Sequence, residues 1–170
     1  FWTRLCAEEE PAAFAKDAAP GRLTELGRRY GQGLQLVNIL RDVGKDSSIG
    51  RCYFPLEEME AHGFGLESVR NDAARLAPVC EKWQRICREH LQCGVEYVEL
   101  IAMKRLRYAA ALPVLIGLRT LGLIERSDGS QRGRGVKVSR GEVAKIALDA
   151  GMAVLRGGGV RRLAGKLAHS

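Results

Sequence analysis

The sequence predicts an all-α protein, and three observations support this fold class. Ala, Leu, Arg and Glu are abundant among the 170 residues, whereas aromatic residues make up only 6%. The alternation of β-branched and polar residues that is typical of strands is almost absent. Nearly half of the residues (46%) are apolar, so a chain of this length can bury one hydrophobic core.

Turn signals divide the first half of the chain into helices. We expect a first helix that ends near Asp17, before the turn residues 19–21. A second, longer helix is expected over residues 23–45. Residues 47–55 have the composition of a loop, and a short helix over residues 56–62 should end at the glycine that follows it.

In the second half, Pro and Gly again set the expected boundaries. A short helix over residues 66–77 should be followed by a long helix from residue 79 to 103 or beyond, because apolar residues recur at helical spacing. Pro113 should start or kink the next helix, which we expect over residues 114–124. The polar, Gly-rich residues 127–135 predict a loop.

The last expected helix has a recognisable N-terminal signal. Ser139 and Glu142 have the S-x-x-E spacing of a capping box, which predicts that a helix begins at Arg140. A run of three glycines should end this helix. We therefore expect a helical domain over residues 1–156 and a basic, mobile tail over residues 157–170.

A line of polar side chains marks the second expected helix. Because successive helical residues turn by about 100°, four polar residues fall within an arc of roughly 80°: Gln35, Asn38, Asp42 and Asp46. Leu, Ile and Val cover the remaining circumference, so we expect this helix to be buried. Buried carboxylates are costly unless they are paired or bind a metal. The pattern therefore predicts a cavity wall where carboxylates and amides face bound cations.

The spacing of the two aspartates indicates which cation they suit. Asp42 and Asp46 stand one helical turn apart, so their oxygens can converge on one region. Oxygen ligands favour hard cations such as Mg²⁺, with Mn²⁺ as the alternative, and Mg²⁺ binds through few carboxylates plus substrate phosphates. No His or Cys joins the line, which argues against zinc. An ordinary solvated helix face is the competing interpretation.

The segment GQGLQLVNILRDVGKDSSIGRCYFP (residues 31–55) resembles the second aspartate-rich region of the squalene and phytoene synthases, the head-to-head prenyl-diphosphate condensing enzymes. Residues 1–6 are similar to the helix just upstream in that family, and residues 111–121 and 136–143 are similar to its C-terminal helices. The resemblance extends to about Leu155. It implies an isoprenoid-synthase-type helical bundle around a central cavity, of which this chain would hold the C-terminal half.

The resemblance also implies an activity. This activity is the Mg²⁺-dependent condensation of two farnesyl diphosphates to presqualene diphosphate and squalene, with NADPH as a cofactor if squalene is the product. Phytoene, dehydrosqualene or hydroxysqualene synthase is the alternative, although residues 111–121 and 136–143 are more similar to squalene-type enzymes. The family carries two aspartate-rich motifs on facing helices, and this sequence contains one. We therefore expect the chain to be a portion of a larger enzyme and to be inactive alone.

The resemblance assigns roles to residues of the polar line. Asp42 and Asp46, together with Asn38, are the expected metal ligands and catalytic residues. Gln35 and Asn38 are also expected to bind substrate. Arg41 points away from the line by roughly 100°, so we expect an ion-pair partner there and not a phosphate ligand.

Other residues near the line have two interpretations each. Arg51 and Tyr53 follow the helix and could bind diphosphate oxygens, or they could belong to a plain surface loop. Tyr30 could line the substrate pocket, or it could be packed in the core. Gly31 and Gly33 are expected to allow close approach of a neighbouring helix.

The net charge of +7 is concentrated late in the chain and suggests an anionic partner. Because the basic residues are accompanied by no interleaved aromatics and no recognised module, we expect no nucleic acid as a partner. We expect an allylic prenyl diphosphate as substrate and peripheral membrane contact through the basic C-terminal region. A merely solvated basic face is the alternative for that region. A non-catalytic, basic membrane-surface module is the competing hypothesis for the chain, although such a module would not need the polar line.

The expected location is the cytoplasm, with association to a membrane surface. The five cysteines form no CxxC pair and are odd in number, which favours a reducing compartment. The longest apolar run, residues 109–118, is too short to span a bilayer. No N-terminal stretch has the pattern of a signal peptide.

Overall fold

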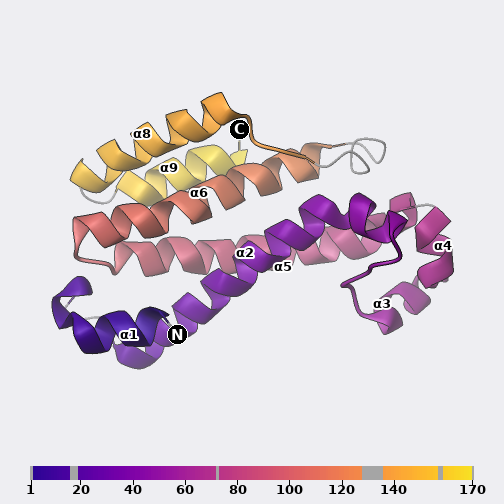
Figure 1. Cartoon of the computed structure of the whole chain (residues 1–170), viewed down its shortest axis with the longest axis horizontal. Coiled ribbons are helices and arrows are strands. Elements are labelled where there is room, and N and C mark those ends of the chain that lie inside the picture. Colours follow the sequence, from indigo (N-terminus) through magenta and orange to yellow (C-terminus); the bar gives the residue numbers. More distant parts are fainter. Residues whose placement is uncertain (1, 16–18, 72, 128–135, 157–158, 170) are drawn as a thin grey trace.

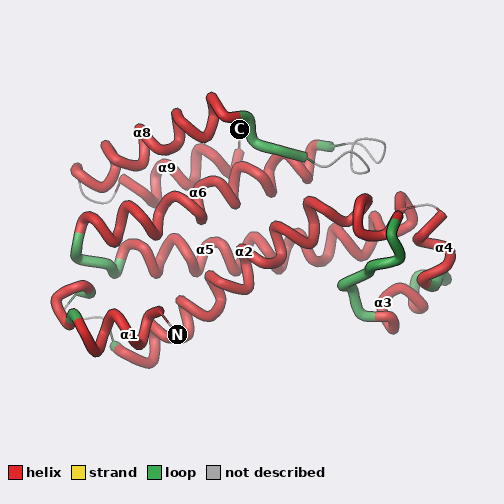
Figure 2. Tube along the Cα trace, in the orientation of Figure 1, coloured by secondary structure: helices red, strands yellow, loops and turns green. Residues whose placement is uncertain are grey.

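A computed structural model describes residues 2–15, 19–71, 73–127, 136–156 and 159–169, and Figures 1 and 2 show these residues as a bundle of helices. No β-strand occurs in these ranges, so the predicted all-α class is confirmed. In chain order the elements are α1 (Trp2–Glu9), a 3₁₀ turn (Pro11–Ala13), α2 (Pro20–Ser48), α3 (Leu56–Ala61), α4 (Leu66–Asn71), a second 3₁₀ turn (Ala73–Leu76), α5 (Ala77–Glu99), α6 (Lys104–Arg126), α8 (Arg140–Arg156) and α9 (Gly159–His169).

The core lies between stacked helices. Helix α2 lies along α5, α6 packs on both, and α8 and α9 together cover α6 (Figure 1). Leu91 of α5 and Leu115 and Leu121 of α6 are completely buried. Burying one such side chain stabilises the fold by about 1.5–3 kcal/mol before entropy is counted. The sheltered side of α2 is therefore fixed by α5 and α6.

The N-terminal helix is shorter than expected. Helix α1 ends at Glu9, whereas we expected a helix to near Asp17, a residue that lies outside the described ranges. Glu10 precedes Pro11, and a residue before a proline rarely adopts the α-helical conformation. The backbone of Glu10, with a φ of −140° and a ψ of 75°, is accordingly not helical. Most of the loop expected over residues 127–135 also lies outside the described ranges.

Helix α5 ends at Glu99, before the expected residue 103, because the residues after it form backbone hydrogen bonds with a distant segment. The residues that follow pair with the segment after the first 3₁₀ turn, and an isolated bridge joins Phe14 to Ile101. Two backbone hydrogen bonds hold the segments together, from the Ala15 N–H to the Leu100 carbonyl (2.9 Å) and from the Ala102 N–H to the Ala13 carbonyl (2.8 Å). These bonds replace those that a longer helix would have made.

Helix α6 runs through Pro113, so the expectation that a helix would start at this proline was wrong. Proline removes the N–H that would bond to the carbonyl of Ala109, and both residues are exposed, so water can satisfy that carbonyl. Ala111 and Val114 on either side are completely buried. Packing on the core therefore keeps the helix continuous across a defect that faces solvent.

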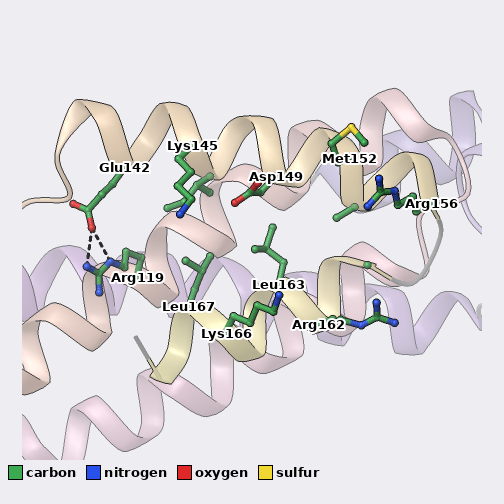
Figure 3. Close-up of a pocket in the computed structure, with 13 residues that line it drawn as sticks. Arg119, Glu142, Lys145, Asp149, Met152, Arg156, Arg162, Leu163, Lys166 and Leu167 are labelled. Carbon is green, nitrogen blue, oxygen red and sulfur yellow. Dashed lines mark hydrogen bonds and ion pairs between the residues drawn. The ribbon is translucent and has the colours of Figure 1, made fainter.

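Residues 159–169 form the packed helix α9, whereas we expected a mobile tail over residues 157–170, of which residues 157, 158 and 170 lie outside the described ranges. Val160 and Ala164 of α9 are buried against the bundle. A Cβ at Gly159 would lie only 2.8 Å from the Ala153 backbone, so glycine lets α9 begin close to α8. The predicted start of α8 at Arg140 is confirmed. Side chains of α8 and α9 face one another across a groove of about 650 Å³ (Figure 3).

One described helix, α6, is long and apolar enough to cross a membrane by length and composition alone. Half of its apolar window (50%) is buried against neighbouring helices. The core helix of a bundle passes the same test, so α6 is only weak evidence for membrane association.

Candidate functional site

The helix that carries the polar line is held at a fixed distance from α5. A Cβ on Gly33 would lie 3.1 Å from the backbone of His90 and of Leu91, which shows that the two helices touch there. The expected close approach is thus confirmed for Gly33. It is wrong for Gly31, which is exposed and has no atom within 4 Å of a Cβ position, because Gly31 lies on the opposite side of α2.

The polar line lies on the side of α2 that the described helices leave uncovered. Gln35 and Asn38 are exposed, and Asp42 and Asp46 are partly buried. The expectation that α2 would be buried all round was therefore wrong for this face, because α5 and α6 cover only the other side. The shared arc of the four side chains follows from helix geometry and holds over the whole length of α2.

Asp42 is held by its neighbour in the sequence. Arg41 donates two hydrogen bonds to the Asp42 carboxylate, from Nη2 to Oδ2 (2.6 Å) and from Nε to Oδ1 (3.0 Å). This bond with Arg41 is the main reason why the pKa of Asp42 lies below its ordinary value, and the charges of Lys45 and Lys137 act in the same direction. Arg41 is thus an ion-pair partner, as expected, although its partner is a member of the line itself. Asp42 is consequently a fixed, ionised carboxylate at neutral pH.

Asp46 stands in the last turn of α2, where the chain reverses. Its carbonyl accepts hydrogen bonds from the Ile49 N–H (3.2 Å) and the Arg51 N–H (2.8 Å). Gly50 has a φ of +76°, a left-handed conformation that glycine adopts without strain. This turn brings Arg51 and Tyr53 out at the same end of α2 as Asp46, and both residues are exposed. They are free to meet a ligand at that end of the line.

Lys137 is a basic residue near the line that sequence reasoning did not connect to it. Its charge lowers the pKa of Asp42 although 95 positions separate the two in the chain. Val136 and Val138 on either side pack against the core and fix the segment. The only sequence signal was the similarity of residues 136–143 to a family segment, because charge alone does not tell which of many basic residues approaches Asp42.

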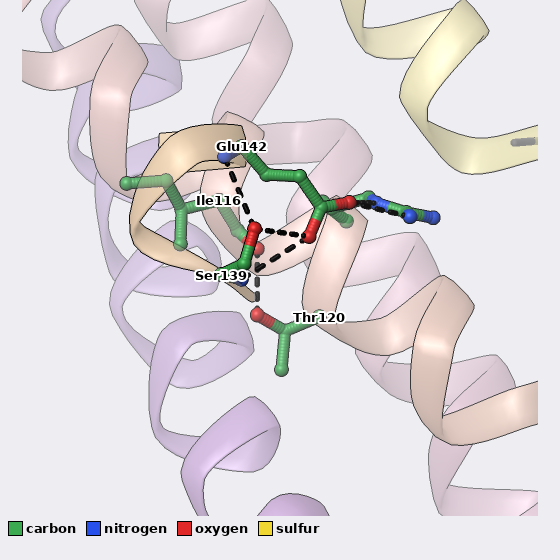
Figure 4. A network of polar contacts seen from close by, with 5 residues as sticks. Ile116, Thr120, Ser139 and Glu142 are labelled. Atoms are coloured by element: carbon green, nitrogen blue, oxygen red, sulfur yellow. Dashed lines mark hydrogen bonds and ion pairs between the residues drawn. The ribbon is translucent and has the colours of Figure 1, made fainter. Parts of the chain in front are cut away.

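The segment that carries Lys137 is anchored by the predicted capping box (Figure 4). The Glu142 N–H donates to Ser139 Oγ (3.2 Å), and the Ser139 N–H donates to Glu142 Oε2 (3.1 Å). Arg119 of α6 binds the other oxygen of Glu142, with Nη2 at 2.7 Å from Oε1. The bond from Arg119 is the largest cause that lowers the pKa of Glu142 to about 2. These contacts confirm the capping box and tie the start of α8 to α6.

Tyr30 is not brought to the polar line. Its ring is buried beside Gly94 of α5, and its hydroxyl donates a hydrogen bond to the Ala110 carbonyl (2.7 Å). Burial raises its pKa above the ordinary value. Of the two interpretations of Tyr30, the structure therefore supports packing in the core.

The donors on the line suit a hard cation. Two carboxylates and two side-chain amides share one face, and no nitrogen or sulfur ligand lies among them. Within the described part of the chain, no group of three or more His, Cys, Asp or Glu residues is placed to hold a metal. Asp42 and Asp46 could therefore supply only part of a coordination shell, which is the way Mg²⁺ binds when phosphates and water supply the rest.

Comparison with known proteins places the chain in a family. The profile of the squalene/phytoene synthase family matches residues 1–142. The chain is similar to a phytoene synthase of Thermus thermophilus, with 35% identity over 101 residues that cover 58% of this chain and 33% of that protein. It is also similar to a presqualene diphosphate synthase of Zymomonas mobilis, with 45% identity over 62 residues that cover 35% of this chain and 21% of that protein. A phytoene synthase of Zea mays is 40% identical over 100 residues, which are 55% of this chain and 24% of the relative.

The aligned parts thus span a third or less of these relatives, whereas the family profile spans most of this chain. The extent of the profile match decides the assignment. The chain belongs to the squalene/phytoene synthase family.

Proposed function

We propose that this chain forms one wall of a site where two allylic prenyl diphosphates condense head to head. The observation that carries the proposal is the line of Gln35, Asn38, Asp42 and Asp46 on the uncovered face of α2, in a chain of this family. An uncovered row of carboxylates and amides fits a wall that a second acidic segment completes. The printed sequence holds one such aspartate pair, so we expect that the 170 residues alone turn over no substrate.

The residues of the wall would divide the binding of cation and substrate between them. Asp42 and Asp46, with Asn38, would hold Mg²⁺, which when bound neutralises the charge of the departing diphosphate. Arg41 keeps Asp42 ionised and oriented, so that the carboxylate does not reorganise when the ligand arrives. Gln35 would hydrogen-bond to the substrate.

The exposed residues at the end of α2 would bind the diphosphate directly. Arg51 can donate two parallel hydrogen bonds to phosphate oxygens, and the Tyr53 hydroxyl can donate a third. Both side chains are exposed beside the last turn of α2, next to Asp46. This placement lets one diphosphate meet the cation and the guanidinium together.

For the substrate, we propose farnesyl diphosphate, with presqualene diphosphate and then squalene as products and NADPH as the reductant. The 45% identity to a presqualene diphosphate synthase over 62 residues supports this choice. The second candidate is a C20 substrate with phytoene as the product, and the 101-residue alignment with a phytoene synthase supports it.

The test uses the protein product of the complete reading frame that encodes this chain. It is incubated with Mg²⁺ and either farnesyl or geranylgeranyl diphosphate, with and without NADPH, and the extracted products are identified by mass. Presqualene diphosphate without NADPH and squalene only with NADPH support the C15 proposal, whereas dehydrosqualene or hydroxysqualene formed without NADPH indicates one of those two synthases. Phytoene from the C20 substrate supports the second candidate. Inertness toward both substrates refutes the condensation.

A matched pair of variants assigns the role of the line. Asp42→Asn should lower kcat by at least about tenfold to a hundredfold, because loss of a direct ligand costs at least as much as loss of a ligand's hydrogen-bond partner. Glu81→Gln, which removes an exposed carboxylate of α5, should leave kcat unchanged. An equal kcat for the two variants would show that Asp42 is not needed for the reaction.

A binding measurement tests the cation site without turnover. Free Mn²⁺ is followed by electron paramagnetic resonance as the 170-residue chain is added, with and without inorganic pyrophosphate. We expect binding only when pyrophosphate is present, and its loss in Asp42→Asn. Binding that Asp42→Asn leaves unchanged would contradict the assignment of the cation to this line.

A further inference from the structure

Gly31 has no structural role that the described helices explain. It lies in the interior of α2, where glycine is less favourable than alanine. Its backbone is helical, because the positive φ values among the described glycines belong to Gly50 and Gly63. No described atom lies within 4 Å of the position that a Cβ would take, whereas the same position at Gly33 meets the backbone of α5. Neither a turn nor helix packing therefore accounts for glycine at this position.

Gly31 faces the same way as the polar line. Eleven positions separate it from Asp42, so the two residues point within about 20° of each other at 100° per residue. Beyond Gln35, the line therefore continues into a position without a side chain. Leu34 and Ile39 lie on either side of this stretch, and both are partly buried apolar residues. A ligand that binds to the line can thus extend along α2 and across Gly31.

Helix α1 limits this open stretch, because it lies against the first half of α2 (Figure 1). A Cβ at Gly27 would lie only 2.5 Å from the side-chain oxygen of Thr3. The Thr3 hydroxyl is itself held by a hydrogen bond that it donates to the Tyr97 hydroxyl of α5 (3.1 Å). The stretch therefore has the aspartates at one end and a fixed wall at the other.

The length of the stretch matches a prenyl chain. Because a helix rises about 1.5 Å per residue, Gly31 lies roughly 16 Å and Gly27 roughly 22 Å from Asp42 along the axis. Four carbon–carbon bonds of about 1.5 Å extend each isoprene unit by about 5 Å. An extended C10 chain of about 10 Å that starts at Asp42 therefore stops short of Gly31, whereas a C15 chain of about 15 Å reaches it and a C20 chain of about 20 Å crosses it.

We propose that Gly31 is a specificity-determining residue, which admits long prenyl chains because it leaves the path along α2 open. This inference rests on the condensation proposed above, which places the diphosphate at the aspartates. The chain would lie over Gly31, between Leu34 and Ile39, and α1 would limit its length. A helix from a further segment of a longer protein fits less well, because a helix seated on Gly31 would also cover Gln35 one turn away.

The test measures the binding of unreactive analogues of geranyl, farnesyl and geranylgeranyl diphosphate, in which sulfur replaces the oxygen that links the chain to the diphosphate. Isothermal titration calorimetry with Mg²⁺ gives the Kd of each analogue for the protein product of the complete reading frame. Gly31→Leu should raise the Kd of the C15 and C20 analogues by about tenfold or more, since one methylene group in an apolar pocket is worth about 10- to 200-fold. The Kd of the C10 analogue and of inorganic pyrophosphate should stay unchanged.

Two further variants separate this effect from an effect on folding. Gly141→Leu places the same side chain at an exposed glycine of α8, where no described atom lies within 4 Å of a Cβ either. It should leave all four Kd values unchanged. Gly31→Ala adds one methyl group and should raise the Kd of the C15 and C20 analogues by a smaller factor. Circular dichroism verifies that each variant keeps its helices.

Unchanged binding of the C15 and C20 analogues to Gly31→Leu would refute the proposal, and so would an unchanged protein that binds none of the analogues. A loss of equal size for all four ligands, together with a lower Tm, would show that a protein segment and not a prenyl chain covers Gly31. A selective loss of the long analogues, in a protein that turns over neither farnesyl nor geranylgeranyl diphosphate, would contradict the condensation and support the path across Gly31.

Discussion

Two glycines of the same helix should respond in opposite ways to the same substitution. Gly31 and Gly33 both lie inside α2, two positions apart, and both have an ordinary helical backbone. Gly31→Ala adds a methyl group to open space, whereas Gly33→Ala places it 3.1 Å from the backbone of α5. The pair therefore separates helix propensity from packing within one helix.

The magnitudes follow from two opposing effects. Replacing glycine by alanine inside a helix stabilises it by up to about 1 kcal/mol, and at Gly31 nothing opposes this gain. At Gly33 the contact is with backbone atoms of His90 and Leu91, which cannot rotate away as a side chain can. Overpacking of this kind costs about 1–3 kcal/mol. The unfolding free energies of the two variants should thus differ by about 1–3 kcal/mol, with Gly31→Ala the more stable.

Urea unfolding followed by circular dichroism measures this difference. With an m-value of about 2 kcal/mol/M, the two midpoints should differ by roughly 0.5–1.5 M, and the m-values should stay equal. Equal midpoints for the two variants would refute the close approach of α2 to α5 at Gly33. A stabilised Gly33→Ala variant would do the same.

Two further predictions concern the anchor of α8. Ser139→Ala should lower the unfolding free energy by about 1 kcal/mol because it removes the cap, and Ser139→Asn should restore most of the loss, as thermal unfolding of the three proteins will show. The second concerns acid: because the pKa of Glu142 is lowered to about 2 from 4.5, its stabilising contribution is present above about pH 4.5 and is lost as the pH falls toward 2. The difference in Tm between the unchanged chain and Glu142→Gln should therefore shrink over that interval, and a constant difference would contradict the ion pair with Arg119.

Local signals in the sequence were sufficient where the structure depends on local chemistry. The capping box of Ser139 and Glu142 fixed the start of α8, and Gly63, with a φ of +77°, follows the end of α3. The end of α5 could not be predicted, because it depends on hydrogen bonds to a segment more than eighty positions away. Pro113 misled the prediction because the effect of a proline depends on whether the carbonyl it leaves unpaired faces solvent, which periodicity does not reveal.

In the candidate site, too, features that depend on local geometry could be predicted, and features that depend on tertiary packing could not. Helix geometry alone placed Gln35, Asn38, Asp42 and Asp46 in one row, because that row needs only the turn per residue. Which side of α2 would be covered depends on α5 and α6, and the sequence of α2 is apolar enough to have suggested burial on every side. The approach of Lys137 to Asp42 depends on how the segment before α8 packs, so no local pattern could reveal it.

The charges around Asp42 bear on the ligand that this face of α2 can accept. Arg41 already takes both oxygens of the carboxylate, and the charges of Lys45 and Lys137 also act on it. Three positive charges oppose the approach of a bare divalent cation, although they keep Asp42 ionised. A cation that arrives with a diphosphate is anionic as a complex, so the same charges attract it, and the phosphate oxygens fill the coordination positions that two aspartates leave open. The electrostatics of this face therefore suit a metal–diphosphate complex better than a free metal ion, which is why we expect Mn²⁺ to bind only together with pyrophosphate.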